Sequence, residues 1–156
     1  MPAASEAAGT SPELPRTWRP LGARIAVYVF GGMLVAMLVA VWFALGAEVR
    51  ASFTIFQRLT LVVLGVMLFA CYHALVRSRV VATEAGLVVV NGYRTHRYEW
   101  SQVIAVQLGR GAPWGTLDLS DGETVSMIAI QGSDGDRARR AVRELRVLVA
   151  AHTPAA

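Results

Sequence analysis

The side chains that could carry out chemistry are few and scattered along the sequence. The three histidines are widely separated, whereas a metal site needs several ligands at short spacing. The single cysteine, Cys71, cannot build an internal disulfide framework or a multi-cysteine zinc site. No serine or cysteine has a histidine and an acid placed nearby, as a nucleophilic triad requires. The sequence therefore predicts no catalytic residue, no bound metal and no cofactor.

Two acidic or glycine-rich segments resemble ligand sites without having the necessary spacing. Asp118, Asp121 and Glu123 do not follow the spacing of a calcium-binding loop, and Asp121 belongs to a predicted turn. Gly109–Gly111 lacks the spacing and the strand-to-helix context of a phosphate-binding loop. We therefore expect solvated carboxylates at the first segment and a break between strands at the second.

The candidate contact residues that remain are basic. Arg94, His96 and Arg97 form a small patch on a predicted strand, and Arg110 adds a further basic position. A lipid headgroup or an acidic protein would match such a patch, and the competing interpretation is the exposed polar face of a strand. Nucleic acid is not an expected partner, because residues 77–156 balance ten arginines against eight acids.

The composition indicates that this patch belongs to a membrane protein. With 54% hydrophobic and 17% charged residues, the chain is more apolar than an ordinary soluble domain. Ile25–Ala47 holds 23 residues without a charge, and Leu59–Val76 holds 18. Helices of this length cross a hydrocarbon core of about 30 Å. We predict transmembrane helices at about 25–47 and 57–76, integrated in the lipid bilayer.

The first run has two further properties. A signal peptide is the alternative interpretation, but the run is longer than the usual apolar core of about 7–15 residues, and a second run follows it. Small residues recur at four-residue spacing, which favours close packing against another helix. The competing interpretation is that Ala and Gly are simply common in bacterial membrane spans. They are Gly32, Ala36, Ala40 and Ala44.

Arginines flanking the two runs predict the orientation in the membrane. They are Arg16, Arg19 and Arg24 before the first run, Arg77 and Arg79 after the second, and Arg50 and Arg58 in the loop. Because positive residues are retained on the inner side, this asymmetry favours a multi-pass protein of the cell membrane with both termini in the cytoplasm.

Residues 77–152 change in character and predict a small α+β domain. We expect a disordered tail at 1–22, the helical hairpin at 23–76, and a short tail at 153–156. Short runs broken by turns predict antiparallel strands at 79–83, 87–90, 93–100, 103–108, 116–120 and 123–130. A helix capped by Ser133, with Asp136 completing the capping box, follows them. Its apolar stripe comprises Ala138, Ala141, Val142, Leu145, Leu148 and Val149. The expected fold is a split barrel or bent sheet whose open end this helix covers.

Two turns set the expected strand register. Asn91-Gly92 is a strong signal for a two-residue hairpin loop and would place Val90 opposite Tyr93. For the later hairpin, a three-residue loop at 120–122 places Leu117 opposite Val125 and collects the apolar residues on one face.

The order of these elements resembles a known family. Gly86-Leu87, Asn91-Gly92 and the stretch Tyr98–Val103, with its W-S-x-V element, are similar to bacterial membrane proteins that carry a pleckstrin-homology (PH)-like domain. The closer similarity is to the actinobacterial group that includes low-molecular-weight protein antigen 6, and it covers roughly residues 57–150. The resemblance implies a PH-like domain without catalysis. It does not imply a phosphoinositide ligand, because the first hairpin loop, taken as 83–86, is acidic.

These features lead to three functional hypotheses. The first is a non-enzymatic membrane protein that presents a cytoplasmic PH-like module for protein interaction or assembly. The alternative is a sensor of anionic lipid headgroups that uses the same module. The third, a membrane enzyme or transporter using His73, has less support, because a histidine near the end of a span is commonly interfacial.

The topology can be tested with single cysteines in a Cys71→Ser background. A cysteine at Ser52 should react with an impermeant thiol reagent in intact cells, and one at Ser133 should not. The opposite labelling pattern would contradict the cytoplasmic orientation and favour a secreted domain.

Overall fold

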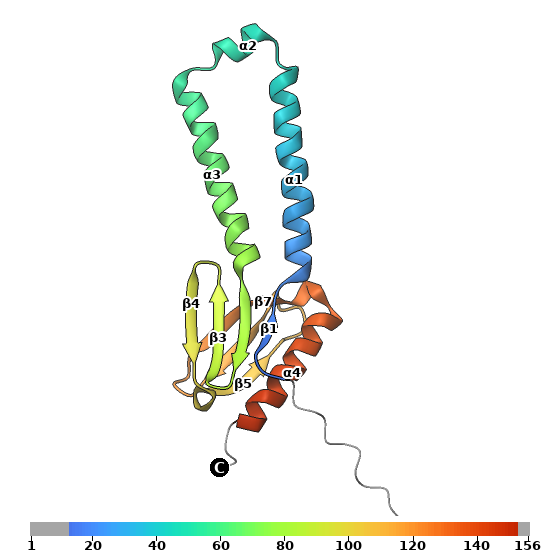
Figure 1. The fold of residues 1–156 in the computed structure, drawn as a ribbon, viewed down its shortest axis with the longest axis vertical. Helices are drawn as coiled ribbons and strands as arrows, with labels where there is room; N and C mark the ends of the chain where they lie inside the picture. Colours follow the sequence, from blue (N-terminus) through green and yellow to red (C-terminus); the bar gives the residue numbers. More distant parts are fainter. Residues whose placement is uncertain (1–12, 153–156) are drawn as a thin grey trace, which may run out of the picture.

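A computed structural model describes residues 13–152 of the chain, so the residues before and after this range, including the tail expected at 153–156, lie outside it. Two long helices form a hairpin that stands on one end of a domain built from two small sheets and a helix (Figure 1). A short helix joins the two long ones at the far end of the hairpin. The helices are α1 (Leu21–Ala44), α2 (Ala47–Ser52) and α3 (Ile55–Arg77).

Both long helices could cross a membrane by length and composition. They have 24 and 23 residues, a mean hydropathy of 2.3, and no part of the apolar windows is buried within the chain. The first begins earlier than the expected 25–47, and the loop between the spans contains α2, which the sequence did not indicate. Thr54 caps α3 through a reciprocal pair of hydrogen bonds with Gln57.

The small-residue stripe of α1 does not form the contact between the two helices. Nothing lies within 4 Å of the position that a Cβ would take at Gly32. The neighbouring Gly31 faces α3 instead, where a Cβ would lie 3.7 Å from the Tyr72 ring. The stripe of Gly32, Ala36, Ala40 and Ala44 is exposed and is not the contact between α1 and α3, so its packing against another helix stays a prediction.

The strands form one four-stranded and one three-stranded antiparallel sheet, in the orders β1-β2-β3-β4 and β5-β6-β7. They are β1 (Arg16–Trp18), β2 (Arg79–Thr83), β3 (Gly86–Asn91), β4 (Arg94–Tyr98), β5 (Val103–Gln107), β6 (Trp114–Leu119) and β7 (Thr124–Gln131). The third expected strand ends early, because Trp100–Gln102 forms a 3-10 turn, and there the Trp100 indole donates to the backbone oxygens of Thr83 and Glu84.

The expectation of a disordered tail over residues 1–22 is wrong for its last part. Arg16–Trp18 pairs with β2, Trp18 opposite Val80, and α1 begins at Leu21. Trp18 is a member of the buried core, and its apolar burial together with the strand pairing explains why this segment is ordered. The two strands that flank the helical hairpin in sequence are therefore neighbours in one sheet. The helical hairpin is the connection between β1 and β2, and the 83–86 turn is the next connection, between β2 and β3.

The turn predicted at Asn91-Gly92 lies one residue further along the chain. Asn91 pairs with Arg94, so Gly92-Tyr93 is the loop and Val90 lies opposite Thr95. Gly92 has a φ of +62°, and a type II′ turn requires a positive φ at its first loop residue. Within the described range only glycines have a positive φ, so Tyr93 has a negative one, as this turn type also requires. Asn91 stays in β3 because its side chain bonds to the backbone of Ser126 and Ile128 in β7.

The register of the second hairpin is confirmed. Leu117 lies opposite Val125, and Gly122 has a φ of +86°. The amide of Gly122 donates to the oxygen of Leu119, which closes the three-residue loop. Leu117 and Met127 are consequently fully buried on the same face.

The C-terminal helix covers the core as expected, but it begins later. A 3-10 turn at Gly132–Asp134, called η2, precedes α4 (Asp136–His152), so Ser133 does not cap the helix. All six residues of the predicted apolar stripe are buried. They pack with side chains from both sheets, which makes α4 the element that closes the domain (Figure 1).

Truncating the centre of this stripe should damage the domain. Leu145 has no exposed surface, and Leu145→Ala should lower the free energy of unfolding by about 2–5 kcal/mol through lost burial and a cavity. Arg143→Ala, on the exposed side of the same helix, should change it by less than about 0.5 kcal/mol. Denaturant unfolding of the full chain in detergent, followed by tryptophan fluorescence, measures both. Equal midpoints for the two variants would show that α4 does not close the core.

Candidate functional site

The basic residues singled out in the sequence lie in two separate places. Arg94, His96 and Arg97 are exposed on β4, the edge strand of the four-stranded sheet. Because side chains alternate along a strand, Arg94 and His96 share one face and Arg97 lies on the other. The His96 ring stacks on Tyr98 at 6.2 Å between centroids. Arg110 belongs to the loop between β5 and β6, so the four residues do not form one patch.

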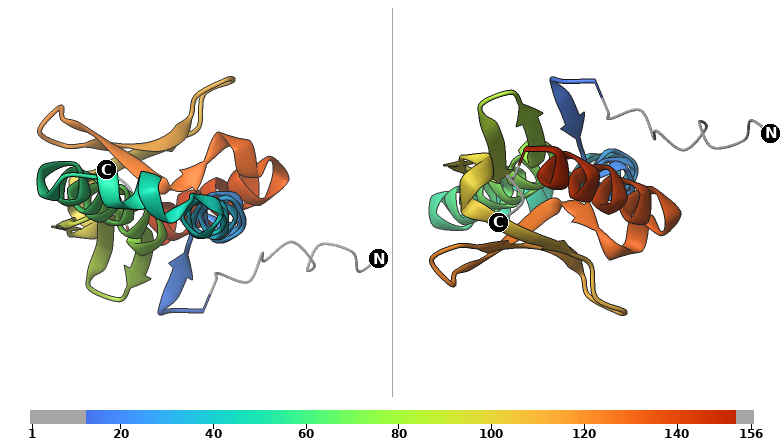
Figure 2. Two further views of the ribbon diagram at one scale, coloured as in Figure 1. Left: turned by 90° about the horizontal axis from the view of Figure 1, so that it is seen from above. Right: turned by 90° about the horizontal axis from the view of Figure 1, so that it is seen from below.

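Arg110 instead contributes to a cleft that the sequence analysis missed. The loop between β5 and β6 projects beside α4 (Figure 2), and together with η2 they enclose about 650 Å³. Four arginines line this space, Arg110 from the loop and Arg139, Arg143 and Arg146 from α4. We call it the arginine cleft. No carboxylate from the described range lines it.

Helical spacing and a close backbone approach build the arginine cleft. Arg139, Arg143 and Arg146 follow each other at intervals of four and three residues and share one side of α4. The loop is held against η2 by the Gly132 amide, which donates to the Pro113 oxygen at 2.9 Å. Gly132 is required there, since a Cβ would lie 2.2 Å from the Ala112 oxygen. The helical spacing could be seen in the sequence, but the loop opposite could not.

The arginines of the cleft keep most of their hydrogen-bonding capacity. Arg146 donates from Nε to the Val106 oxygen at 2.7 Å, which ties it to β5 and leaves its other N–H groups available. Arg139 Nη1 lies 3.2 Å from Asp136 Oδ1, and both side chains are largely exposed. Such exposed pairs are weak, about 0–1 kcal/mol. The cleft is therefore strongly positive.

An aspartate of the domain caps the first long helix. The Asp134 carboxylate accepts hydrogen bonds from the amides of Leu21 and Gly22 at 3.1 and 2.9 Å. Pro20, the residue before the helix, offers no side-chain cap of its own. A carboxylate at this end satisfies free N–H groups and interacts favourably with the helix dipole. The end of the domain that carries η2 is thereby fixed to the start of α1.

The second long helix is joined to the domain through the turn between β3 and β4. The Tyr93 hydroxyl donates to the Ala70 oxygen at 3.1 Å and lies 3.1 Å from His73 Nδ1. The Gly92 amide donates to the buried Ser78 hydroxyl at 3.0 Å. His73 thus has a place in the joint between helix and sheet, next to a tyrosine that also stacks on it at 5.7 Å.

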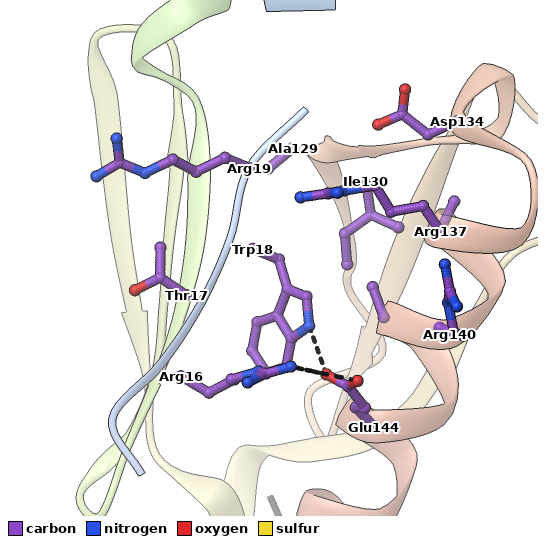
Figure 3. Close-up of a pocket in the computed structure, with 12 residues that line it drawn as sticks. Arg16, Thr17, Trp18, Arg19, Ala129, Ile130, Asp134, Arg137, Arg140 and Glu144 are labelled. Carbon is purple, nitrogen blue, oxygen red and sulfur yellow. Dashed lines mark hydrogen bonds and ion pairs between the residues drawn. The ribbon is translucent and has the colours of Figure 1, made fainter. Parts of the chain in front are cut away.

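A third contact joins β1 to α4. The Trp18 indole donates to a Glu144 carboxylate oxygen at 3.0 Å, and Arg16 forms an ion pair with the same carboxylate at 3.3 Å (Figure 3). The space around them is about 230 Å³, and Arg137 and Arg140 also line it. Since Glu144 already bonds to Arg16 and Trp18 of β1, this arrangement is a structural link between strand and helix.

The acidic hairpin residues serve the local turn. Asp118 accepts hydrogen bonds from Gln107 and Thr124, and Asp121 accepts the Glu123 amide at 3.0 Å. Burial raises the pKa of Tyr98, with smaller contributions from Glu123 and Asp121. No group of three or more potential metal ligands is assembled anywhere in residues 13–152.

Comparison with known proteins identifies this architecture. Residues 77–147 match the bacterial PH domain family. Over 146 residues the chain is 33% identical to the uncharacterized protein Rv1417 of Mycobacterium tuberculosis (strain ATCC 25618 / H37Rv), covering 88% of this chain and 87% of that protein. The uncharacterized protein Mb1452 of Mycobacterium bovis matches to the same extent.

The chain belongs to the bacterial PH domain family. No solved structure matches it significantly. The family match begins at residue 77 and thus omits β1, whereas the match to the mycobacterial proteins extends over most of the chain, helical hairpin included. The resemblance inferred from the sequence is confirmed. The PH-like domain of this chain also uses a strand from before the hairpin to complete its first sheet.

Removing Glu144 should weaken the link between β1 and α4. Glu144→Ala leaves the indole N–H of Trp18, a largely buried residue, without its partner and should cost about 1–3 kcal/mol of unfolding free energy. Asp136→Ala removes the exposed pair with Arg139 and a carboxylate from the first turn of α4, and should cost about 1 kcal/mol or less. Denaturant midpoints of the two variants in detergent measure the difference, and equal shifts would contradict the role given to Glu144.

Proposed function

We propose that this chain is a non-enzymatic protein of the cell membrane that presents its PH-like domain at the cytoplasmic face for protein interaction or assembly. The two long apolar helices supply the membrane anchor. The observation that carries the proposal is the exposed edge of the first sheet, at β4. Within the described residues, β4 pairs with β3 alone, so one side of its backbone is open.

An open strand edge recruits partners through its backbone. Unpaired N–H and C=O groups can accept an additional strand, and the flanking side chains then select which strand binds. Arg94, His96 and Arg97 are exposed along this edge. They disfavour pairing with a second copy of the same basic strand and favour an acidic segment of another protein.

The position of β4 suits a partner in the same membrane. In the turn that leads into β4, Tyr93 bonds to α3 and Gly92 bonds to Ser78, the residue after α3, so the strand starts next to the hairpin. The links at Asp134 and Ser78 hold the domain against both long helices. A partner bound at β4 would therefore meet a domain of fixed orientation.

The arginine cleft favours the alternative function, a sensor of anionic lipid headgroups. Four arginines there face a space without carboxylates, and basic pockets beside membrane helices suit phosphate-bearing headgroups. This site differs from the loop 83–86 considered in the sequence, which is acidic through Glu84. The two functions use different surfaces and can be tested separately.

Site-specific photo-cross-linking in intact cells tests the interaction at β4. A photoreactive phenylalanine analogue at Thr95, exposed in the middle of the strand, should give an adduct of defined mass. The same analogue at Thr124, exposed at the start of β7, is the matched control and should not. Arg94→Glu combined with Arg97→Glu should reduce the Thr95 adduct severalfold, because an acidic partner would be repelled. An adduct that survives charge reversal, or that forms equally at Thr124, would contradict the proposal.

A further inference from the structure

We infer that the arginine cleft binds the phosphate-bearing headgroup of an anionic phospholipid in the leaflet next to the domain. The inference deepens the alternative function proposed above and rests on the membrane placement of the helical hairpin. It assigns the contact to Arg110, Arg139, Arg143 and Arg146, at a distance from the β4 edge.

Charge and geometry in the cleft fit phosphate. Guanidinium groups are planar forks that bind phosphate oxygens in pairs, and charge-assisted hydrogen bonds of this kind are stronger than neutral ones. The loop and the helix place arginines on two sides of one space, Arg110 facing those of α4. Asp136, outside the lining, pairs with Arg139 and offsets part of this charge. A bound anion would therefore relieve repulsion among arginines that the fold brings together.

The end of the cleft formed by η2 and the β5–β6 loop lies next to the start of α1. Asp134 binds the amides at the start of α1, and the uncharged part of the helix starts at Ile25, one turn later. That turn is about 5–6 Å long, close to the thickness of one headgroup layer, about 5–7 Å. η2 therefore lies at the outer boundary of the headgroups. Its Gly132 bonds to Pro113, so the loop with Arg110 lies at the same end of the domain.

An exposed tryptophan directly after the loop of the cleft supports a lipid over a protein partner. Trp114 follows Pro113 directly, pairs with Gln131 just before η2, and is 40% exposed. Tryptophan is enriched at the membrane–water boundary, where its apolar ring and its N–H group are both accommodated. An exposed tryptophan in the strand that follows the loop of Arg110 matches a headgroup layer. An acidic protein segment would be matched by the arginines alone.

Lipid retention by the full chain tests this inference. The protein is purified in detergent, and phosphatidylglycerol or phosphatidylcholine is added in equal amounts before native mass spectrometry. The parent should retain phosphatidylglycerol in preference to phosphatidylcholine. Arg110→Gln combined with Arg143→Gln should weaken this retention about tenfold or more, as expected for the loss of charge-assisted hydrogen bonds.

Two further variants distinguish binding at the cleft from a general effect of the protein's net charge. Arg94→Gln combined with Arg97→Gln removes the same charge from β4 and should retain phosphatidylglycerol like the parent. Arg110→Lys combined with Arg143→Lys keeps the charge without the fork and should restore part of the retention. Equal loss in the β4 and cleft variants, or no loss in the cleft variant, would overturn the inference.

A peptide probe distinguishes the other class of partner. A fluorescent oligoglutamate peptide should bind the parent and the cleft variant alike. If the cleft variant loses this peptide but keeps phosphatidylglycerol, the cleft is a protein site and the inference is wrong. Because the β4 cross-link is measured independently, failure of the lipid test leaves the outcome at β4 unaffected.

Discussion

The pairing of β1 with β2 is the constraint on which the rest of the structure depends. These strands lie at the two ends of the helical hairpin, and their antiparallel pairing requires α1 to begin close to where α3 ends. The same pairing brings Trp18 into the core and Arg16 to Glu144. The hairpin is thus an insertion between two neighbouring strands. Because the chain leaves the sheet from β1 and returns to it at β2, both helices are attached to the same sheet. This restricts their position relative to the domain far more than a single linker would.

Side-chain and backbone hydrogen bonds turn that restriction into a fixed joint. Asp134 supplies the cap that α1 lacks, and Ser78 bonds both to the last turn of α3 and to the Gly92 amide. Each of these contacts satisfies a backbone group that the secondary structure leaves free. The domain therefore carries its surfaces in a defined relation to the two long helices, which matters for any partner that is itself held in a membrane.

The division of α4 into two faces links stability to the proposed function. The apolar face, from Ala138 to Val149, is buried in the core. The opposite face holds arginines at helical spacing, and an exposed helical face of this kind is usually only solvated. Here the loop between β5 and β6 folds over it, held by Pro113 and Gly132, and converts that face into the wall of a cleft.

The sequence alone determined what depends on local pattern. Uncharged length predicted the two long helices, the apolar stripe predicted the buried face of α4, and the alternation around Gly122 predicted the second hairpin. Each of these follows from the spacing of residues within one segment, where side-chain period and burial are coupled. The order of these elements then indicated the bacterial PH proteins.

Only the tertiary structure decided the features that join distant segments. The three-residue strand β1 has no pattern of its own and is ordered by β2 and α4. The Asn91 side chain reaches β7, which moves the predicted turn by one residue. The arginine cleft needs Arg110 and α4 to meet across a fold that neither segment specifies. In each case the stabilising partner lies far along the chain, so the energy that selects the local conformation is absent from the local sequence.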